Sequence, residues 1–263
     1  MPHSFARYAR ITLHGSPTFI ALDSRGFAHV LDGAPWAAAS ATGQELSPGA
    51  LEGVAWLCPV SPSKIIGIGR NYRKHAEELG NAVPEEPLMF FKPPSSLLDP
   101  GGSVRLPPES TRVDHEAELA VVIGRRVRRV GLEEARRAVF GYSIACDVTA
   151  RDLQQKDKQW TRGKGFDTFC PLGPAVVPLA DPGSLLLSLR VGAELRQTGS
   201  TKDMIHDVPT LVAYASQTMT LEPGDVILTG TPEGVGPLAP GDAVTIAIEN
   251  IGSLAFHVAA EPR

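Results

Sequence analysis

A run of acidic residues that leads into an apolar stretch places the strongest constraint on the fold of this chain. Residues 111–124 read TRVDHEAELAVVIG. If this run is one strand, its side chains alternate between two faces, and Asp114, Glu116 and Glu118 point to the same side. Two ionised carboxylates about 5 Å apart repel each other by roughly 3 kcal/mol at an effective dielectric near 20. The fold must therefore either expose this face to water or bring positive charge against it.

Both solutions are compatible with the pattern of residues. The first is a solvated sheet edge, with the carboxylates in water and Leu119, Val121 and Ile123 facing the core. The second is a divalent cation held by Glu116 and Glu118. Oxygen ligands without Cys or paired His favour Mg²⁺, Mn²⁺ or Ca²⁺ over zinc. The pattern alone leaves both interpretations open.

A two-carboxylate metal site needs at least one more ligand, and Asp147 is the candidate. It ends the apolar run of SIACDVTARD, which reads as a strand. Asp is also a common N-cap residue, so Asp147 could instead cap a helix that begins at Val148. These two roles for Asp147 stay open at this point.

The order of apolar runs and turn residues predicts a mixed α+β, β-rich chain. Residues 1–60 are expected to form a small N-terminal β-rich domain, followed by the main domain at residues 61–263. NYRKHAEELG predicts a brief helix that stops at Gly80, LEEARRAVFGY predicts a second helix, and YSIACDVTARD predicts a strand that runs into a helix. The stretch VPEEPLMFFKPPSSLLDPGGSVRLPP excludes a continuous helix. Pro-Gly pairs in LEPGDVIL and LAPGDAVTI predict type II turns before strands.

Composition narrows the class of partner. The formal net charge of −4 and the pI near 6.0 do not provide the broad basic surface that nucleic-acid binding usually needs, so small solutes are better candidates. Cys58, Cys146 and Cys170 lack CxxC spacing, which argues against a disulfide framework or a zinc knuckle and fits a reducing cytosol. No apolar run has the length of a membrane span or a signal peptide. We expect a soluble, cytoplasmic protein.

Six motifs in order carry a family resemblance. They are GRNYRKHAEELG, FFKPPSSLLDPGG, DHEAELAVVIG, GYSIACDVTARDLQ, RGKGFDTFCPLGP and LEPGDVILTGTPEGVGP. Together they resemble the fumarylacetoacetate hydrolase family in its bacterial, single-domain form, over about residues 63–257. The resemblance implies a β-roll or mixed β-sandwich, a homodimer and a Mg²⁺ or Mn²⁺ site. It also implies that Glu116, Glu118 and Asp147 are the metal ligands, with Asp114 outside the coordination sphere.

The resemblance also implies roles in proton transfer. His75 and Glu78 are three residues apart and share a helix face, and by spacing alone they would be a surface pair. The family carries such a pair on a mobile lid helix, where it orients and deprotonates water. Lys164 in RGKGFD is placed beside the metal by the same resemblance. A nearby cation would favour its neutral amine and make proton transfer feasible at neutral pH.

Substrate-binding residues follow from the same comparison of motifs. LTGTPEGVG lacks the GxxxxGK[ST] spacing, which excludes a nucleotide P-loop. The resemblance implies instead that Thr231 and backbone donors hold a substrate carboxylate. Arg70, Arg151 and Gln154 match positions that contact substrate oxygens. By composition alone Arg70 would be an ordinary surface arginine, although its guanidinium could clamp a carboxylate with two hydrogen bonds.

The expected function is therefore a Mg²⁺- or Mn²⁺-dependent enzyme that acts on a 2-oxo acid through an enolate. Relatives of similar layout are 2-hydroxyhepta-2,4-diene-1,7-dioate isomerase and 5-oxopent-3-ene-1,2,5-tricarboxylate decarboxylase of aromatic catabolism. Acylpyruvate hydrolase, oxaloacetate decarboxylase and oxaloacetate tautomerase occur in the same family. The three reaction types share one enolate, so the sequence does not choose among them. A catalytically silent metal-binding scaffold is the alternative, and the retention of His75, Glu78 and Lys164 argues against it.

Overall fold

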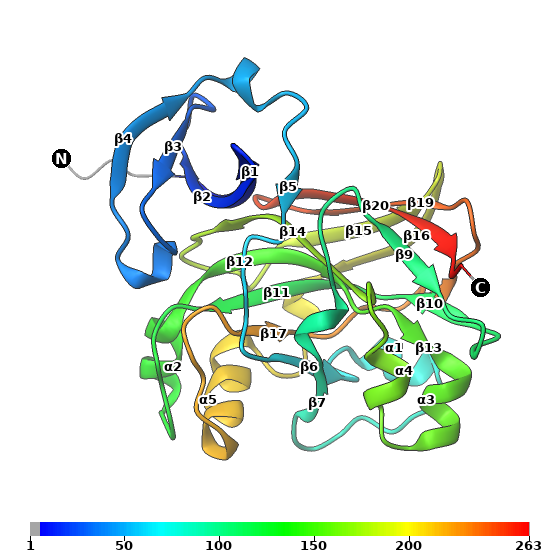
Figure 1. The fold of residues 1–263 in the computed structure, drawn as a ribbon. Coiled ribbons are helices and arrows are strands. Elements are labelled where there is room, and N and C mark those ends of the chain that lie inside the picture. The colour runs from blue at the N-terminus through cyan, green and yellow to red at the C-terminus, as the bar shows by residue number, and fades with distance from the viewer. Residues whose placement is uncertain (1–5, 263) are drawn as a thin grey trace.

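A computed structural model describes residues 6–262, and the fold is strand-rich with short helices on its outside (Figure 1). One large sheet has the order β4-β3-β2-β1-β14-β12-β11-β17-β6-β7, with β5 paired to β1 and β8 paired to β14. Its strands are β1 (Arg7–Leu13), β2 (Ser16–Leu22), β3 (Ala28–Leu31), β4 (Ala41–Leu46), β5 (Trp56–Leu57), β6 (Ile65–Gly69), β7 (Leu88–Lys92), β8 (Leu97–Leu98), β11 (Ala117–Ile123), β12 (Val139–Cys146), β14 (Cys170–Val177) and β17 (Val226–Leu228).

Two smaller sheets and several helices complete the described fold. The order β16-β15-β19-β20-β9 joins β9 (Ser103–Leu106), β15 (Leu186–Val191), β16 (Glu194–Ser200), β19 (Ala243–Ile248) and β20 (Gly252–Ala260). The order β13-β10-β18 joins β10 (Val113–His115), β13 (Thr149–Ala150) and β18 (Gly236–Pro237). The α-helices are α1 (Arg73–Glu78), α2 (Leu132–Ala138), α3 (Arg151–Asp157), α4 (Thr161–Lys164) and α5 (Val208–Thr218), and 3-10 turns lie at Pro35–Ala37, Pro48–Leu51, Pro94–Ser96 and Thr201–Asp203.

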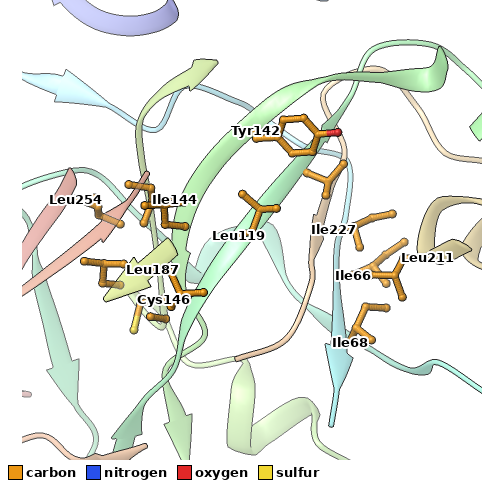
Figure 2. Packing of buried hydrophobic residues seen from close by; sticks show 14 of the residues in the cluster. Ile66, Ile68, Leu119, Tyr142, Ile144, Cys146, Leu187, Leu211, Ile227 and Leu254 are labelled. Atoms are coloured by element: carbon orange, nitrogen blue, oxygen red, sulfur yellow. The ribbon is translucent and has the colours of Figure 1, made fainter. Parts of the chain in front are cut away.

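The main hydrophobic core lies against one face of the large sheet. Figure 2 shows Ile144 of β12 beside Leu187 of β15 and Leu254 of β20. This contact packs the five-stranded sheet against the large one. On the same face, Ile66 and Ile227 point toward Leu211 of α5 (Figure 2). A second cluster covers the opposite face, so every residue of β11 is buried. Burial on both faces explains why the sequence becomes a continuous apolar run after residue 118.

The N-terminal strands extend the large sheet. Antiparallel pairing of β1 with β14 sets Tyr8 opposite Val176 and Ala9 opposite Ala175. Trp36 packs edge-on against Phe140 of β12 at a centroid distance of 5.8 Å. The β-rich character expected for residues 1–60 is therefore present across their described part, and this segment is hydrogen-bonded to the main body.

Three local predictions are confirmed. Helix α1 ends at Glu78, and Gly80 follows with a φ of 66°. The proline-rich stretch contains β7, a 3-10 turn, β8 and β9 in place of a helix. In both Pro-Gly turns the glycine has a positive φ, 88° at Gly224 and 96° at Gly241, as a type II turn requires. The turns lead into β17 and β19.

Two local predictions are wrong. The acidic run is not one strand, because β10 ends at His115, β11 begins at Ala117, and the two strands belong to different sheets. The helix predicted for LEEARRAVFGY stops at Ala138, and β12 starts at the next residue. The residues that leave the helix are β-branched, aromatic or glycine, which suits a sheet better than a helix. Among the helices of residues 6–262, none is long and apolar enough to cross a membrane.

Candidate metal centre and active site

Three carboxylates converge where β10, β11 and β12 meet. Glu116 links β10 to β11, Glu118 lies in β11, and Asp147 directly follows β12. Because β11 and β12 pair antiparallel with Ala117 opposite Cys146, the two strand ends carry their acidic residues to one place. One oxygen from each carboxylate lies within 4.8 Å of the others. The side chains are buried, so the solvated-edge interpretation is wrong.

Asp147 is not a helix cap. Its backbone N–H donates to the carbonyl of Glu116 at 2.8 Å, and the next helix, α3, begins only at Arg151. Both oxygens of its carboxylate instead accept from lysines: Oδ2 from Lys164 at 2.6 Å and Oδ1 from Lys92 at 2.8 Å. The alternative of an Asp147 cap for a helix beginning at Val148 is therefore wrong.

Buried cations balance most of the acidic charge. Lys164 Nζ donates to Glu116 Oε2 at 2.7 Å, and Arg151 Nη2 donates to Glu116 Oε1 at 2.7 Å. Burial would lower the pKa of Lys164, but Asp147 and Glu116 outweigh it and raise that pKa above its usual value. A neutral Lys164 amine therefore requires that another cation take over the charge of these carboxylates.

Glu118 differs from its two neighbours because no cation within residues 6–262 forms an ion pair with it. Its Oε2 accepts from the backbone N–H of Gly230 at 2.7 Å. Burial, together with the charges of Asp147 and Glu116, raises the pKa of Glu118 well above its ordinary value. For Glu116, burial acts in the same direction, but Lys164 and Arg151 outweigh it and hold its pKa below the usual range. Glu118 is the acidic group that most needs a further positive charge.

The donor set fits a hard divalent cation. Four carboxylates in this region are buried, namely Asp114, Glu116, Glu118 and Asp147, and they face three buried cations, Lys92, Arg151 and Lys164. The exposed Arg112 adds a fourth cation by pairing with Asp114, so the formal charges balance, and among the described residues Glu118 is the one acid of the cluster without a cationic partner. Oxygen atoms with net negative charge are the ligands that Mg²⁺, Mn²⁺ and Ca²⁺ prefer. The cluster could therefore hold such an ion.

Asp114 lies outside this cluster. It accepts from Arg112 Nε at 2.9 Å and from Arg112 Nη2 at 3.1 Å. Arg151 Nε donates to it at 3.0 Å, and Arg151 Nη1 donates to Gln154 Oε1 at 2.8 Å. Asp114 therefore holds Arg151 in the orientation in which it contacts Glu116. Because the Gln154 oxygen is occupied, the Gln154 amide nitrogen is left to donate elsewhere.

His75 and Glu78 lie together on α1, above the loop that follows β17. His75 Nδ1 is 3.4 Å from Glu78 Oε2, and burial lowers the pKa of His75. The Glu78 carboxylate also accepts from the backbone N–H of Gly234, at 3.0 and 3.2 Å. Lys74 forms an ion pair with Glu233 at 3.3 Å. Two contacts thus fasten α1 to the TGTPEGVG loop, and one of them uses the carboxylate that supports His75.

A cavity of about 670 Å³ contains the acidic cluster. Every residue predicted for the site lines this cavity except Glu78, which contacts the lining residue His75. Arg70 has a left-handed backbone, with a φ of 57°, as is common for residues that are strained at functional sites. Apolar side chains form much of the remaining wall: Leu79, Leu88, Met89, Phe90 and Trp160.

Three comparisons relate this geometry to known proteins. The model of the fumarylacetoacetate (FAA) hydrolase C-terminal family matches residues 64–259. The chain belongs to this family. A second model, Rv2993c-like, N-terminal, matches residues 6–59. The family fold expected from the six motifs is confirmed.

Curated relatives in the family include named enzymes. Oxaloacetate tautomerase FAHD1, mitochondrial, of Arabidopsis thaliana is 49% identical over 203 residues, which cover 74% of this chain and 91% of the relative. Oxaloacetate tautomerase YcgM of Escherichia coli is 46% identical over 194 residues, which cover 71% of this chain and 89% of the relative.

Solved structures of the family extend the range of reactions. The 2-hydroxyhepta-2,4-diene-1,7-dioate isomerase from Mycobacterium marinum has a TM-score of 0.89 at 38% identity, covering 98% of this chain and 100% of the isomerase. Fumarylpyruvate hydrolase from Pseudomonas aeruginosa, solved with Mn²⁺ and pyruvate, has a TM-score of 0.73 at 33% identity, covering 78% of this chain and 91% of the hydrolase.

Several residues that surround the carboxylate cluster and the cavity were not identified from the sequence. Lys92 follows two phenylalanines and ends β7, and a lysine that closes an apolar strand was the available signal. Trp160 and Phe90 stack edge-to-face at 5.2 Å, and Lys164 Nζ lies 5.0 Å from the Phe90 ring centroid. Gln197 on β16 bonds to the same loop as Thr231, and no motif pointed to it.

Proposed function

We propose that the protein is a Mg²⁺- or Mn²⁺-dependent enzyme that acts on a 2-oxo acid through an enolate. The observation that carries the proposal is the buried cluster of Glu116, Glu118 and Asp147 at the wall of a large cavity, in which Glu118 has no cationic partner among the described residues. When bound there, a divalent cation would withdraw electron density from the 2-oxo group and stabilise the negative charge that develops on it. A dication at this place would add positive charge to the cavity wall, which suits an anionic substrate.

Four side chains are proposed to bind and orient the substrate. Thr231 and Arg70 would hold carboxylate oxygens, the first through its hydroxyl and the second through two guanidinium donors. Gln154 has its oxygen on Arg151, so its amide N–H groups can donate to a substrate oxygen. Arg151 also lines the cavity, and the guanidinium N–H groups not used by Asp114, Gln154 and Glu116 remain available for the substrate.

Proton transfer is proposed to be divided between His75 and Lys164. With its pKa lowered by burial, His75 is neutral at pH 7 and can accept a proton from water, while Glu78 would hold its ring and stabilise the imidazolium that forms. Lys164 lies beside both Glu116 and Asp147. Once another cation balances these carboxylates, its amine could deliver or remove a proton at the enolate carbon.

Keto–enol isomerisation of a small 2-oxo diacid is the reaction we propose first. Relatives named oxaloacetate tautomerase support it, with 46% to 49% identity over more than two thirds of the chain. C–C bond hydrolysis is the second candidate, because the His75–Glu78 pair is suited to activating water and would not be needed for enolisation alone. Decarboxylation uses the same enolate. A place in aromatic-compound catabolism is a further proposal, supported by the isomerase from Mycobacterium marinum.

The test is restoration of activity by metal. The protein is stripped with EDTA, Mg²⁺ or Mn²⁺ is added back, and enol absorbance is followed with oxaloacetate and with acylpyruvates as substrates. We expect metal-dependent turnover that is lost in Glu118→Gln and kept in Glu109→Gln, a matched change of an exposed glutamate. A decay of enol absorbance without release of pyruvate identifies isomerisation, and release of pyruvate identifies cleavage.

The alternative is a catalytically silent metal-binding scaffold of the same fold. Metal binding without turnover of any 2-oxo acid would establish that alternative and refute the enzymatic proposal. We also propose a homodimer, on the basis of the family resemblance, and light scattering coupled to size-exclusion chromatography tests it. A mass near 28.0 kDa, that of one chain, would refute the dimer.

A further inference from the structure

The amide of Gln197 is held in one orientation by backbone groups. Gln197 lies on β16 and is 1% exposed. Its Oε1 accepts from the backbone N–H of Ala117 at 3.1 Å, and its Nε2 donates to the carbonyl of Pro232 at 3.0 Å. A backbone N–H can only donate and a carbonyl can only accept, so exchanging the amide oxygen and nitrogen would break both bonds.

This orientation determines what the hydroxyl of Thr231 can do. Gln197 Nε2 also donates to Thr231 Oγ1 at 2.8 Å, so the hydroxyl oxygen is the acceptor in this bond. The proton of the Thr231 hydroxyl is then left for a different acceptor. Thr231 is buried and lines the cavity that contains the carboxylate cluster. The hydroxyl therefore has a proton to offer to a molecule bound in the cavity.

A second donor keeps the Gln197 oxygen in place. His115 is fully buried, and its Nδ1 lies 3.1 Å from Gln197 Oε1. Because that oxygen can only accept, Nδ1 carries the imidazole proton. Gln197 Oε1 is thus held by two donors, one from Ala117 and one from His115, and Nε2 is held by two acceptors. All the hydrogen-bonding groups of the amide are used, which favours a rigid side chain.

We propose that Gln197 is a positioning residue that makes Thr231 a hydrogen-bond donor toward an anionic oxygen of the substrate. The inference rests on the proposed function, because it requires a 2-oxo acid at Thr231. A freely rotating hydroxyl could point either its proton or a lone pair at the substrate, and a lone pair would repel a carboxylate. Gln197 removes this freedom before the substrate binds, which is how preorganised donors increase affinity for an anion.

The experiment compares three substitutions in the Mn²⁺-loaded protein. Gln197→Met removes the amide and keeps the length of the side chain. Gln197→Glu keeps the shape but replaces the donor with a carboxylate oxygen, which would draw the Thr231 proton away from the cavity. Thr231→Val removes the hydroxyl. The control is Gln44→Met, because Gln44 is exposed on β4 in the N-terminal strands.

Dissociation constants for pyruvate and for Mn²⁺ are measured by titration calorimetry. We expect Thr231→Val to weaken pyruvate binding about tenfold, as the loss of one charge-assisted hydrogen bond predicts. Gln197→Met should weaken it less, and Gln197→Glu should weaken it more than Thr231→Val. In the Thr231→Val background, Gln197→Met should cause no additional loss. Gln197→Met should lower the melting temperature in any case, because it leaves the Ala117 N–H, the Pro232 carbonyl and His115 without their partner. Mn²⁺ affinity should nevertheless be unchanged in Gln197→Met, whereas a merely structural role would weaken Mn²⁺ and pyruvate binding together.

The possible contradictions separate this inference from the proposed function. If Thr231→Val weakens pyruvate binding and both Gln197 variants leave it unchanged, the role of Gln197 is refuted and the substrate site stands. An additional loss from Gln197→Met in the Thr231→Val background would also refute it, because Gln197 would then act on something other than Thr231. If Thr231→Val has no effect, the substrate role of Thr231 fails and the inference fails with it. Should Gln197→Glu not fold, Gln197→Met and the double variant decide the question.

Discussion

At the scale of single residues, Lys92 is a buried cation that holds one carboxylate of the candidate metal centre in place. Its side chain is almost completely buried, and its Nζ donates to Asp147 Oδ1, to the carbonyl of Val148 and to the carbonyl of Lys164. It thereby neutralises one oxygen of Asp147 and anchors the end of α4, which carries Lys164. The other oxygen of Asp147 faces Lys164.

Lys92→Met should destabilise the metal-free protein by about 3 kcal/mol, because removing one partner of a buried ion pair leaves a carboxylate uncompensated. Saturating Mn²⁺ should recover part of this loss by supplying positive charge at the cluster. Urea unfolding with and without Mn²⁺ measures both effects. The control is Lys64→Met, which removes the partner of buried Asp225 outside the site. Equal recovery by Mn²⁺ in the two variants would contradict the role of Lys92.

The raised pKa of Glu118 predicts that metal binding releases a proton. Its pKa is raised well above the ordinary value by burial and by Asp147 and Glu116, so it retains a proton to higher pH than a normal glutamate. A cation must displace that proton, and apparent Mn²⁺ affinity should therefore increase with pH until Glu118 is ionised. Calorimetry in two buffers with different ionisation enthalpies should show proton release, which is reduced in Glu118→Gln. An undiminished release in that variant would assign the proton to another group.

At the scale of elements, α1 and the loop after β17 act as one unit. Glu78 contacts both His75 and the Gly234 N–H, so the short helix is held over the cavity by the carboxylate that supports the proposed base. Gly234 has a φ of 92°, and a Cβ there would lie 2.3 Å from the Arg196 carbonyl. The loop conformation that presents its N–H to Glu78 is therefore restricted to glycine.

The pH dependence of acylpyruvate hydrolysis, the reaction for which a water-activating pair is needed, should report on this unit. Burial lowers the pKa of His75 below 6.5, so the neutral base persists as the pH falls and the acidic limb of kcat/KM should lie below pH 6.5. The Glu78 hydrogen bond opposes that shift, so Glu78→Gln should move the limb to still lower pH and reduce kcat by 10-fold or more. Glu77→Gln, on an exposed position of the same helix, is the control. An unmoved limb in Glu78→Gln would contradict the proposed pairing.

At the scale of the whole molecule, the N-terminal strands continue the large sheet, while the candidate site lies elsewhere. Every residue with a proposed catalytic, metal-binding or substrate-binding role lies between Arg70 and Thr231, and the N-terminal strands have a separate core cluster. A chain of residues 61–263 should therefore bind Mn²⁺ with an affinity within a few-fold of the full protein. It should melt at a lower temperature and aggregate more readily, because it exposes part of the β14 edge that pairs with β1. A folded truncated chain without Mn²⁺ binding would contradict this division.

The sequence predicted which residues lie together at the candidate site better than it predicted the local structure that carries them. The acidic residues, His75 and Lys164 were identified by motif, and the pairing of β11 with β12 explains why Glu116 and Asp147 meet. The break at Glu116 could not be predicted, because no Gly or Pro marks it and it depends on two sheets meeting there. Lys92 and Gln197 were missed for a related reason. Their importance comes from partners distant in the chain, and local pattern carries no information about such contacts.

The short loop after β17 has a consequence for regulation. Gly230 holds Glu118, Thr231 faces the cavity, and Gly234 holds Glu78, all within five consecutive residues. The proposed ligation of an ion by Glu118, the proposed binding of an acid by Thr231 and the position of α1 thus depend on a shared stretch of backbone. If binding of the acid increases the affinity for the ion by some factor, binding of the ion must increase the affinity for the acid by the same factor. Substitutions on α1 that do not contact the ion can consequently change the affinity for the metal.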